Sequence, residues 1–179
     1  MKNISKILLP AAFCIIAGLS YAKEQVKPLP RNISSVTLGI SLKEATEKYQ
    51  IEDVSHHFKN ILQNKHLKIY AFSNKFAPSG ASGLIGTFYG DKLYRLEATF
   101  APEYTKKISW RKFLKQADYK GHKSETSKMR LENSKQKRIV YTDGLTTITY
   151  TRDKHLKPKK IYYYLSVGNI AFSNSCLVK

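Results

Sequence analysis

The chain has 179 residues, and its 31 Lys and Arg against 13 Asp and Glu give a formal net charge of +18. A field of that size favours anionic partners and disfavours cationic ones. Aromatic residues, mostly Tyr, make up 12% of the chain, which argues against general disorder and for a packed sheet.

Residues 1–22 have the pattern of a signal peptide. Two lysines precede an apolar stretch from Ile7 to Leu19, which is short for a membrane span. Ser20 and Ala22 place small residues where signal peptidase cuts, so we expect cleavage after Ala22. We therefore predict export to a bacterial periplasm, with the mature protein soluble or peripheral to a membrane.

Cleavage would leave one cysteine, Cys176, of the 2 in the chain. The mature protein then has no intramolecular disulfide, and its core must hold the fold unaided. Two readings of Cys176 stay open, a buried thiol and an intermolecular disulfide between two copies. A homo-oligomer held by sheet edges is a related expectation.

Residues 23–37 contain two prolines and no sustained periodicity, so we predict an extended leader before a single domain at 38–179. Ser41 and Glu44 form a Ser-x-x-Glu capping box, which predicts a short amphipathic helix from Leu42 to Tyr49 or Gln50.

Strands follow the first helix. The alternation in 66–73 predicts a strand, and 74–83 is typical of a loop. Next, 84–89 and 92–101 form a predicted hairpin around Gly90-Asp91. In its second strand we expect one face to carry Tyr94, Leu96, Ala98 and Phe100.

The second half of the chain repeats this order. Ser109 caps a predicted helix whose apolar stripe begins at Trp110, and 119–136 is polar enough to predict a long mobile excursion. A second hairpin spans 138–151, with Asp143-Gly144 at its turn. A last strand at 160–167 places Ile161, Tyr163, Leu165 and Val167 on one face, opposite Tyr162 and Tyr164.

These elements predict an α+β fold in which short helices pack on an antiparallel sheet. The order helix, three strands, helix, three strands suggests tandem α-β-β-β units at 38–101 and 108–167. A chance recurrence of a common topology is the alternative that the sequence leaves open.

The segment from Gly39 to Tyr49, followed by Lys92-Leu93-Tyr94-Arg95-Leu96, resembles small exported proteins of the SmpA/OmlA outer-membrane-assembly type. The tandem layout is also similar to the β-lactamase-inhibitor-protein fold. The resemblance implies a non-enzymatic protein that works by binding other envelope proteins. Support of an outer-membrane or secretion machine is one version of this role, which the sequence does not single out. That assembly family is lipidated at an N-terminal cysteine, which this chain lacks at a suitable place.

The sequence contains no recognisable motif for catalysis, for metal binding or for cofactor binding. His56-His57 beside Asp53 is the best histidine cluster, but adjacent residues point to different sides, so we expect no shared ion. The loop at 79–83 fails the G-x-S-x-G pattern of a nucleophile, because Leu84 stands where the last glycine belongs. We therefore expect neither enzymatic activity nor a cofactor.

The excess of charge is concentrated in the second half, where residues 103–160 hold 17 basic and 6 acidic residues, a net of +11. We expect an acidic face of an envelope protein as partner. Two alternatives stay open, an inhibitor module docked on a hydrolase and a binder of anionic lipid or polysaccharide. Export makes nucleic acid a poor partner.

The candidate binding surface comprises Lys112, Lys115, Lys120, Lys123, Lys157, Lys159, Lys160, Tyr162 and Tyr164.

Overall fold

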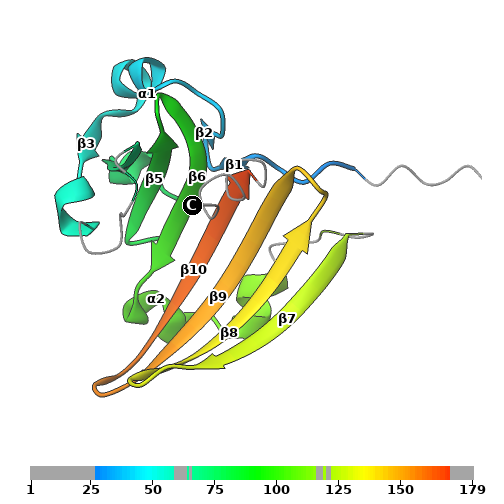
Figure 1. Cartoon of the computed structure of the whole chain (residues 1–179). Helices are drawn as coiled ribbons and strands as arrows, with labels where there is room; N and C mark the ends of the chain where they lie inside the picture. The colour runs from blue at the N-terminus through cyan, green and yellow to red at the C-terminus, as the bar shows by residue number, and fades with distance from the viewer. Residues whose placement is uncertain (1–26, 59–63, 65, 116–118, 120–121, 170–179) are drawn as a thin grey trace, which may run out of the picture.

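The computed structural model describes residues 27–58, 64, 66–115, 119 and 122–169 (Figure 1). The predicted signal peptide and Cys176 lie outside these residues. The described helices are short: α1 (Leu42–Tyr49), α2 (Pro102–Lys107), α3 (Trp110–Lys115), and the 3-10 turns η1 (Ser55–Phe58) and η2 (Asn74–Phe76). None of them is long and apolar enough to cross a membrane.

An antiparallel sheet of eight strands dominates the fold (Figure 1). From one edge to the other its strands are β3 (Ile51–Asp53), β4 (Leu67–Phe72), β5 (Gly83–Tyr89), β6 (Lys92–Phe100), β10 (Lys159–Asn169), β9 (Thr146–Leu156), β8 (Ser134–Thr142) and β7 (Lys123–Arg130). The predicted α+β class is confirmed in this sheet-dominated form.

The order of the strands follows from one crossover. β3 to β6 are added one after another, and the chain then passes through α2 and α3 to the far edge, where β7 begins. β8, β9 and β10 return strand by strand until β10 pairs with β6, with Leu165 opposite Ala98. Each half of the sheet thus holds four strands rather than the three that we predicted, and the tandem repetition itself stays a prediction.

The first helix forms as its capping box predicts. The Ser41 hydroxyl accepts a hydrogen bond from the backbone N–H of Glu44 at 3.1 Å, which satisfies one of the free donors of the first turn. Ala45 and Tyr49 are buried, and Gln50 ends the helix in a left-handed conformation with φ of 50°.

The hairpin of β5 and β6 also forms, with Gly90 at a positive φ of 59° in its turn. Its register is shifted, because Phe88 pairs with Leu93 whereas Thr87 pairs with Arg95. Tyr94 is therefore an extra residue, a β-bulge that reverses the alternation on one side of it. Leu93 is buried, and our assignment of Tyr94 to the face of Leu96 is wrong.

The predicted extended leader is not separate from the fold. Within it, β1 (Asn32–Ile33) and β2 (Val36–Thr37) form a small antiparallel hairpin. Leu29, Ile33 and Val36 expose 2% or less of their surface, since they pack into the same core as the large sheet. The sequence misled us because two-residue strands show no periodicity.

The predicted mobile excursion at 119–136 is also wrong. Residues 123–130 form β7, and β8 begins at Ser134, so most of this polar stretch is paired strand. The side chains of residues 124–130 are exposed, and β7 is an edge strand of the sheet. A strand without a buried face lacks the apolar alternation by which we identify strands.

The core lies on one face of the sheet, which we call the helix face. There the β1–β2 hairpin, α1 and α3 pack against buried residues of the sheet. Phe113 of α3 is central, with ring centroids 4.9 Å from Phe100, 5.0 Å from Tyr163 and 5.6 Å from Tyr150. We call the opposite face of β6, β10, β9 and β8 the open face.

Candidate functional site

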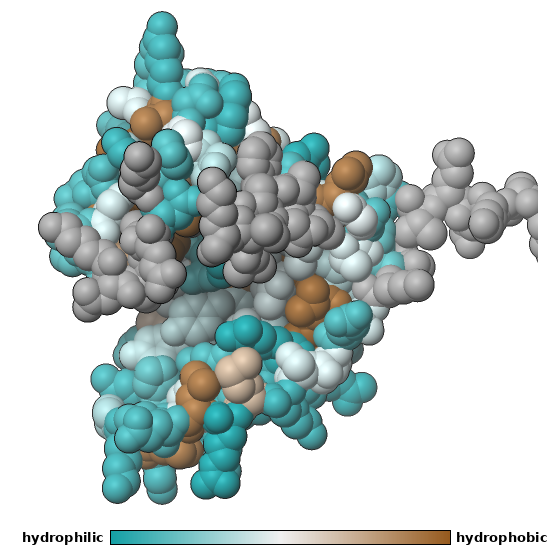
Figure 2. Space-filling model, viewed as in Figure 1, coloured by the Kyte–Doolittle hydropathy of each residue, from teal (hydrophilic) through white to brown (hydrophobic). Residues whose placement is uncertain are grey.

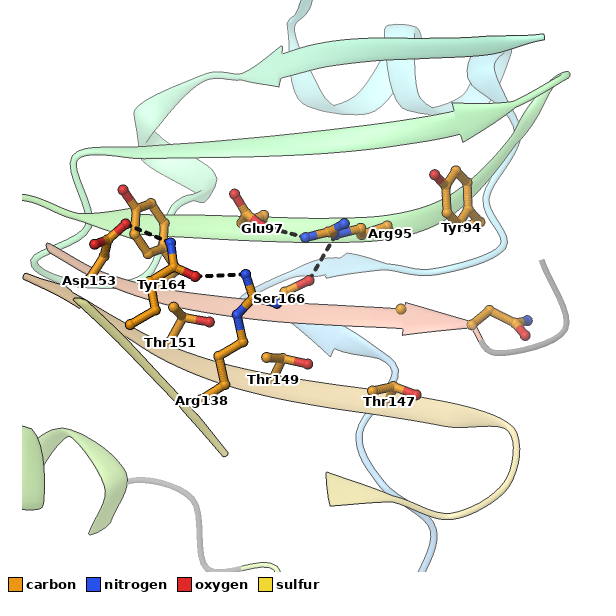
Figure 3. A pocket seen from close by; sticks show the side chains of 13 residues that line it. Tyr94, Arg95, Glu97, Arg138, Thr147, Thr149, Thr151, Asp153, Tyr164 and Ser166 are labelled. Carbon is orange, nitrogen blue, oxygen red and sulfur yellow. Dashed lines mark hydrogen bonds and ion pairs between the residues drawn. The ribbon is translucent and has the colours of Figure 1, made fainter. Parts of the chain in front are cut away.

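A polar cleft of about 650 Å³ lies on the open face, across four adjacent strands (Figure 3). We call it the open-face cleft. Most of its lining residues alternate along β6, β8, β9 and β10, as side chains of a strand do, whereas Tyr94 and Arg95 both line it at the β-bulge. Its lining residues are Tyr94, Arg95, Glu97, Gln136, Arg138, Thr147, Thr149, Thr151, Asp153, Tyr164, Ser166, Gly168 and Asn169.

Two hydrogen-bonded groups organise the charges of this cleft (Figure 3). On β6, Arg95 donates to Glu97 Oε2 at 2.7 Å and to Ser166 Oγ at 3.0 Å. On β8 and β9, Arg138 donates to the side-chain oxygen Oε1 of Gln136 at 2.7 Å, and Gln136 Nε2 donates to Asp153 Oδ2 at 2.8 Å. The Gln136 amide thus connects a cation to an anion across two strands.

Asp153 is the most constrained polar group of the cleft, since it exposes only 7% of its surface. Within the part of the chain that the structure describes, its Oδ1 atom and the Arg138 Nε atom are buried without a hydrogen-bond partner. Buried polar atoms are nearly always hydrogen-bonded in folded proteins. Asp153 and Arg138 thus each keep one buried polar atom that has no partner among the described residues.

A second surface lies on the helix face, beyond the region that α3 covers. Two rows of cations cross β7, β8 and β9 there. In one row Lys128 pairs with Lys137, which pairs with Arg152; in the next, Arg130 pairs with Lys135, which pairs with Lys154. Directly paired residues share a face of a sheet. We call these six residues the cationic grid.

The cationic grid lines a groove of about 430 Å³. No carboxylate lines this groove among the residues that the structure describes. Arg152 also pairs with Tyr163, whose ring centroid is 5.2 Å from that of Trp110 on α3, so the grid adjoins the aromatic core. On the face of the molecule that Figure 2 shows, hydrophilic residues cover much of the visible surface.

The structure separates the predicted binding residues into three groups. Lys112 and Lys115 are exposed on α3, on the helix face. Lys157, Lys159 and Lys160 are exposed at the β9–β10 turn. Tyr162 and Tyr164 lie on the open face, as predicted, with their rings stacked at 6.4 Å. Lys120 and the side chain of Lys123 lie outside what the structure describes.

Sequence reasoning missed the cationic grid as a unit, although its signal is present in the sequence. Each of three segments carries two cations separated by one residue: Lys128 and Arg130, Lys135 and Lys137, and Arg152 and Lys154. In strands this spacing places both cations on one face. Lys128, Arg130 and Lys135 fall in the stretch 119–136, for which the sequence predicts a mobile excursion, so their spacing does not indicate a shared strand face there.

The histidine pair differs from our expectation in one respect. His56 and His57 lie in η1 with ring centroids only 3.9 Å apart, because the turn brings adjacent rings together rather than apart. Among the described residues there is no group of three His, Cys, Asp or Glu side chains that could hold a metal ion.

The comparisons with known proteins add no family to this description. Neither the protein-family models, nor the curated proteins, nor the solved structures contain a match to this chain.

Proposed function

We propose that this chain is an exported, non-enzymatic binding factor that docks on the acidic face of another envelope protein. The observation that carries the proposal is the cationic grid, six Lys and Arg side chains on one face of three adjacent strands. Export rests on the signal-peptide pattern of residues 1–22 and on the resemblance to envelope-assembly proteins.

The arrangement of the cationic grid costs stability in the free protein. Lys137 lies directly opposite both Lys128 and Arg152, and Lys135 lies opposite both Arg130 and Lys154. Like charges in directly opposed positions destabilise a sheet by roughly 0.2–1 kcal/mol per pair. An acidic partner would relieve this repulsion, and the relief would add to the free energy of binding.

Other exposed cations add to the positive charge of the molecule. α3 adds Lys112 and Lys115 on the helix face, and Lys157 and Lys159 lie at the β9–β10 turn. Among the described residues, the carboxylate of Asp153 lines the opposite, open face, so it does not neutralise this surface. The positive electrostatic potential of this surface should therefore speed association with an acidic protein, and this effect should weaken as the salt concentration rises.

A photo-crosslinking experiment in cells tests the proposal. A photoreactive residue at Lys137 should capture a discrete envelope protein, whereas the same residue at the exposed Lys43 on α1 should not. Capture should fail when Lys128, Lys135 and Arg152 are changed to Glu. A matched control changes Arg31, Lys43 and Lys92 to Glu, which alters the net charge equally at exposed positions outside the grid.

The identity of the captured molecule decides between the readings. An assembly of several envelope proteins supports the proposed role, and a single hydrolase would make the chain an inhibitor module. Binding of the purified protein to vesicles of anionic phospholipid or to lipopolysaccharide, without any captured protein, would overturn the proposal in favour of lipid or polysaccharide binding.

A further inference from the structure

We propose that the open-face cleft binds a neutral, hydroxyl-rich ligand of the saccharide class, with Asp153 and Arg138 at the centre of the site. This site lies on the opposite face of the sheet from the cationic grid and does not depend on the proposed partner. The argument rests on the charge, the unused hydrogen-bonding atoms and the shape of the cleft.

The charge of the cleft is balanced, in contrast to the chain as a whole. It contains two cations, Arg95 and Arg138, and two anions, Glu97 and Asp153. Arg95 is paired with Glu97 at 2.7 Å, and Gln136 connects Arg138 to Asp153. In a protein with a formal net charge of +18, a cleft without net charge selects against ionic ligands.

The unused hydrogen-bonding atoms match the chemistry of a hydroxyl group. Asp153 Oδ1 accepts only, and Arg138 Nε donates only. A hydroxyl group both donates and accepts, so the hydroxyls of a sugar can bond to both the carboxylate and the guanidinium that line the cleft. The Asp153 side chain is about nine-tenths buried, which makes an unmet acceptor there costly.

The shape of the site suits a chain of sugar rings. Thr147, Thr149 and Thr151 place three hydroxyls along β9 on the open face, spaced by roughly 6.8 Å because alternate residues share a face. The volume of about 650 Å³ lies in the ordinary range of ligand sites, roughly 300–1,000 Å³. A linear oligosaccharide can therefore follow the strand and meet each hydroxyl in turn.

Tyrosine provides the apolar contact that sugar rings require. Tyr164 lines the cleft and stacks with Tyr162, with an angle of 23° between the rings. Burial, with the negative charges of Asp153 and Glu97 and the neighbouring Tyr162, raises the pKa of Tyr164 to about 12. The phenol therefore stays protonated at physiological pH and can donate a hydrogen bond to a sugar oxygen.

Titration of the isotopically labelled protein with neutral trisaccharides tests the inference. Maltotriose, cellotriose and N,N′,N″-triacetylchitotriose are each added to about 10 mM, well above the weakest Kd of interest. At least one should shift the backbone amide signals of β8, β9 and β10 in a saturable manner. Glucose 1-phosphate serves as the charged counter-probe, and it should shift these signals less.

Variants connect the signal to the proposed residues. Thr149→Val should weaken binding about three- to tenfold through the loss of one hydroxyl, and Asp153→Asn about tenfold or more. Thr126→Val is the matched control, since Thr126 lies on the edge strand β7 outside the cleft. Unfolding curves of each variant show whether it is folded.

Three outcomes would overturn the inference. The first is that no trisaccharide changes the strand signals, and the second is that the charged counter-probe binds more tightly than any of them. The third is that Thr149→Val and Asp153→Asn both bind as the unaltered protein does. Loss of the crosslinked partner in the grid variants, with saccharide binding retained, would show that the two sites are separate.

Discussion

Asp143 accepts a hydrogen bond at 2.9 Å from the backbone N–H of Leu29, a residue 114 positions earlier in the chain. The same carboxylate accepts from the backbone N–H groups of Leu145 at 2.9 Å and Thr146 at 2.6 Å. One side chain therefore closes the β8–β9 turn and attaches the start of the described chain to it.

This relationship predicts a pH-dependent contribution to stability. Burial acts to raise the pKa of Asp143, but the donors from Thr146, Leu145 and Leu29 hold the pKa below its ordinary value of 3.8. The stabilisation is therefore present above that value and is lost as the pH falls through the lower pKa of the folded state. Asp143→Asn should lower the free energy of unfolding near pH 7 by about 1–3 kcal/mol.

Urea unfolding between pH 7 and pH 2.5 measures this effect. Relative to the unaltered protein, Asp143→Asn should lose less stability on acidification, because its side chain does not titrate. Equal losses of stability in the two proteins would contradict the role given to Asp143. Asp91→Asn, at the exposed β5–β6 turn, is the control.

The second prediction concerns the centre of the core. Phe113 exposes 1% of its surface and contacts the rings of Phe100, Tyr150 and Tyr163. Phe113→Ala should lower the free energy of unfolding by about 3–5 kcal/mol, since the helix face would gain a cavity. Leu145→Ala, at a residue that is 66% exposed, should change it by less than about 0.5 kcal/mol. Chemical denaturation compares the two variants.

The third prediction tests the repulsion within the cationic grid. Lys137 faces both Lys128 and Arg152, so Lys137→Gln should raise the free energy of unfolding by about 0.2–1 kcal/mol while it weakens partner binding. The gain should shrink as salt is added, because salt screens the repulsion. Thermal unfolding of both proteins at low and high ionic strength measures this gain in stability. A loss of stability would mean that the grid is neutralised by contacts within the chain.

The fourth prediction concerns close packing at Gly86 on β5. A Cβ atom there would lie 2.6 Å from the Phe72 ring and 2.7 Å from a Leu93 methyl group, closer than packed carbon atoms approach. Gly86→Ala should therefore lower the free energy of unfolding by about 1–3 kcal/mol. Gly83→Ala is the matched control on the same strand, since nothing lies within 4 Å of a Cβ at that position. Equal stability of the two variants would contradict the predicted overlap.

The sequence predicted those elements whose signals are local. The capping box of Ser41 and Glu44 marked α1, and the turns at Gly90 and Gly144 marked two hairpins, because these signals need only a few adjacent residues. The stripe behind Ser109 marked α3, although α2, which begins at Pro102, carried no such stripe and was missed.

The sequence-based predictions that were wrong or missed have a common cause. Tyr94 changed faces because of a bulge, β7 has no buried face, and the strands of the β1–β2 hairpin are too short to show a period. In each case the pairing partner, rather than the residue's own neighbours in sequence, determines which way a side chain points.

The sequence alone determined the excess of cations, the positions of the hairpin turns and the alternation that places Tyr162 and Tyr164 opposite Tyr163. Only the tertiary structure decided that cations from three strands form one grid, and that Asp153, Arg138 and Glu97 share one cleft. The reason is that both surfaces depend on strand order and register. These are set by the crossover through α2 and α3 and by the pairing of β10 with β6, which joins residues far apart in the chain.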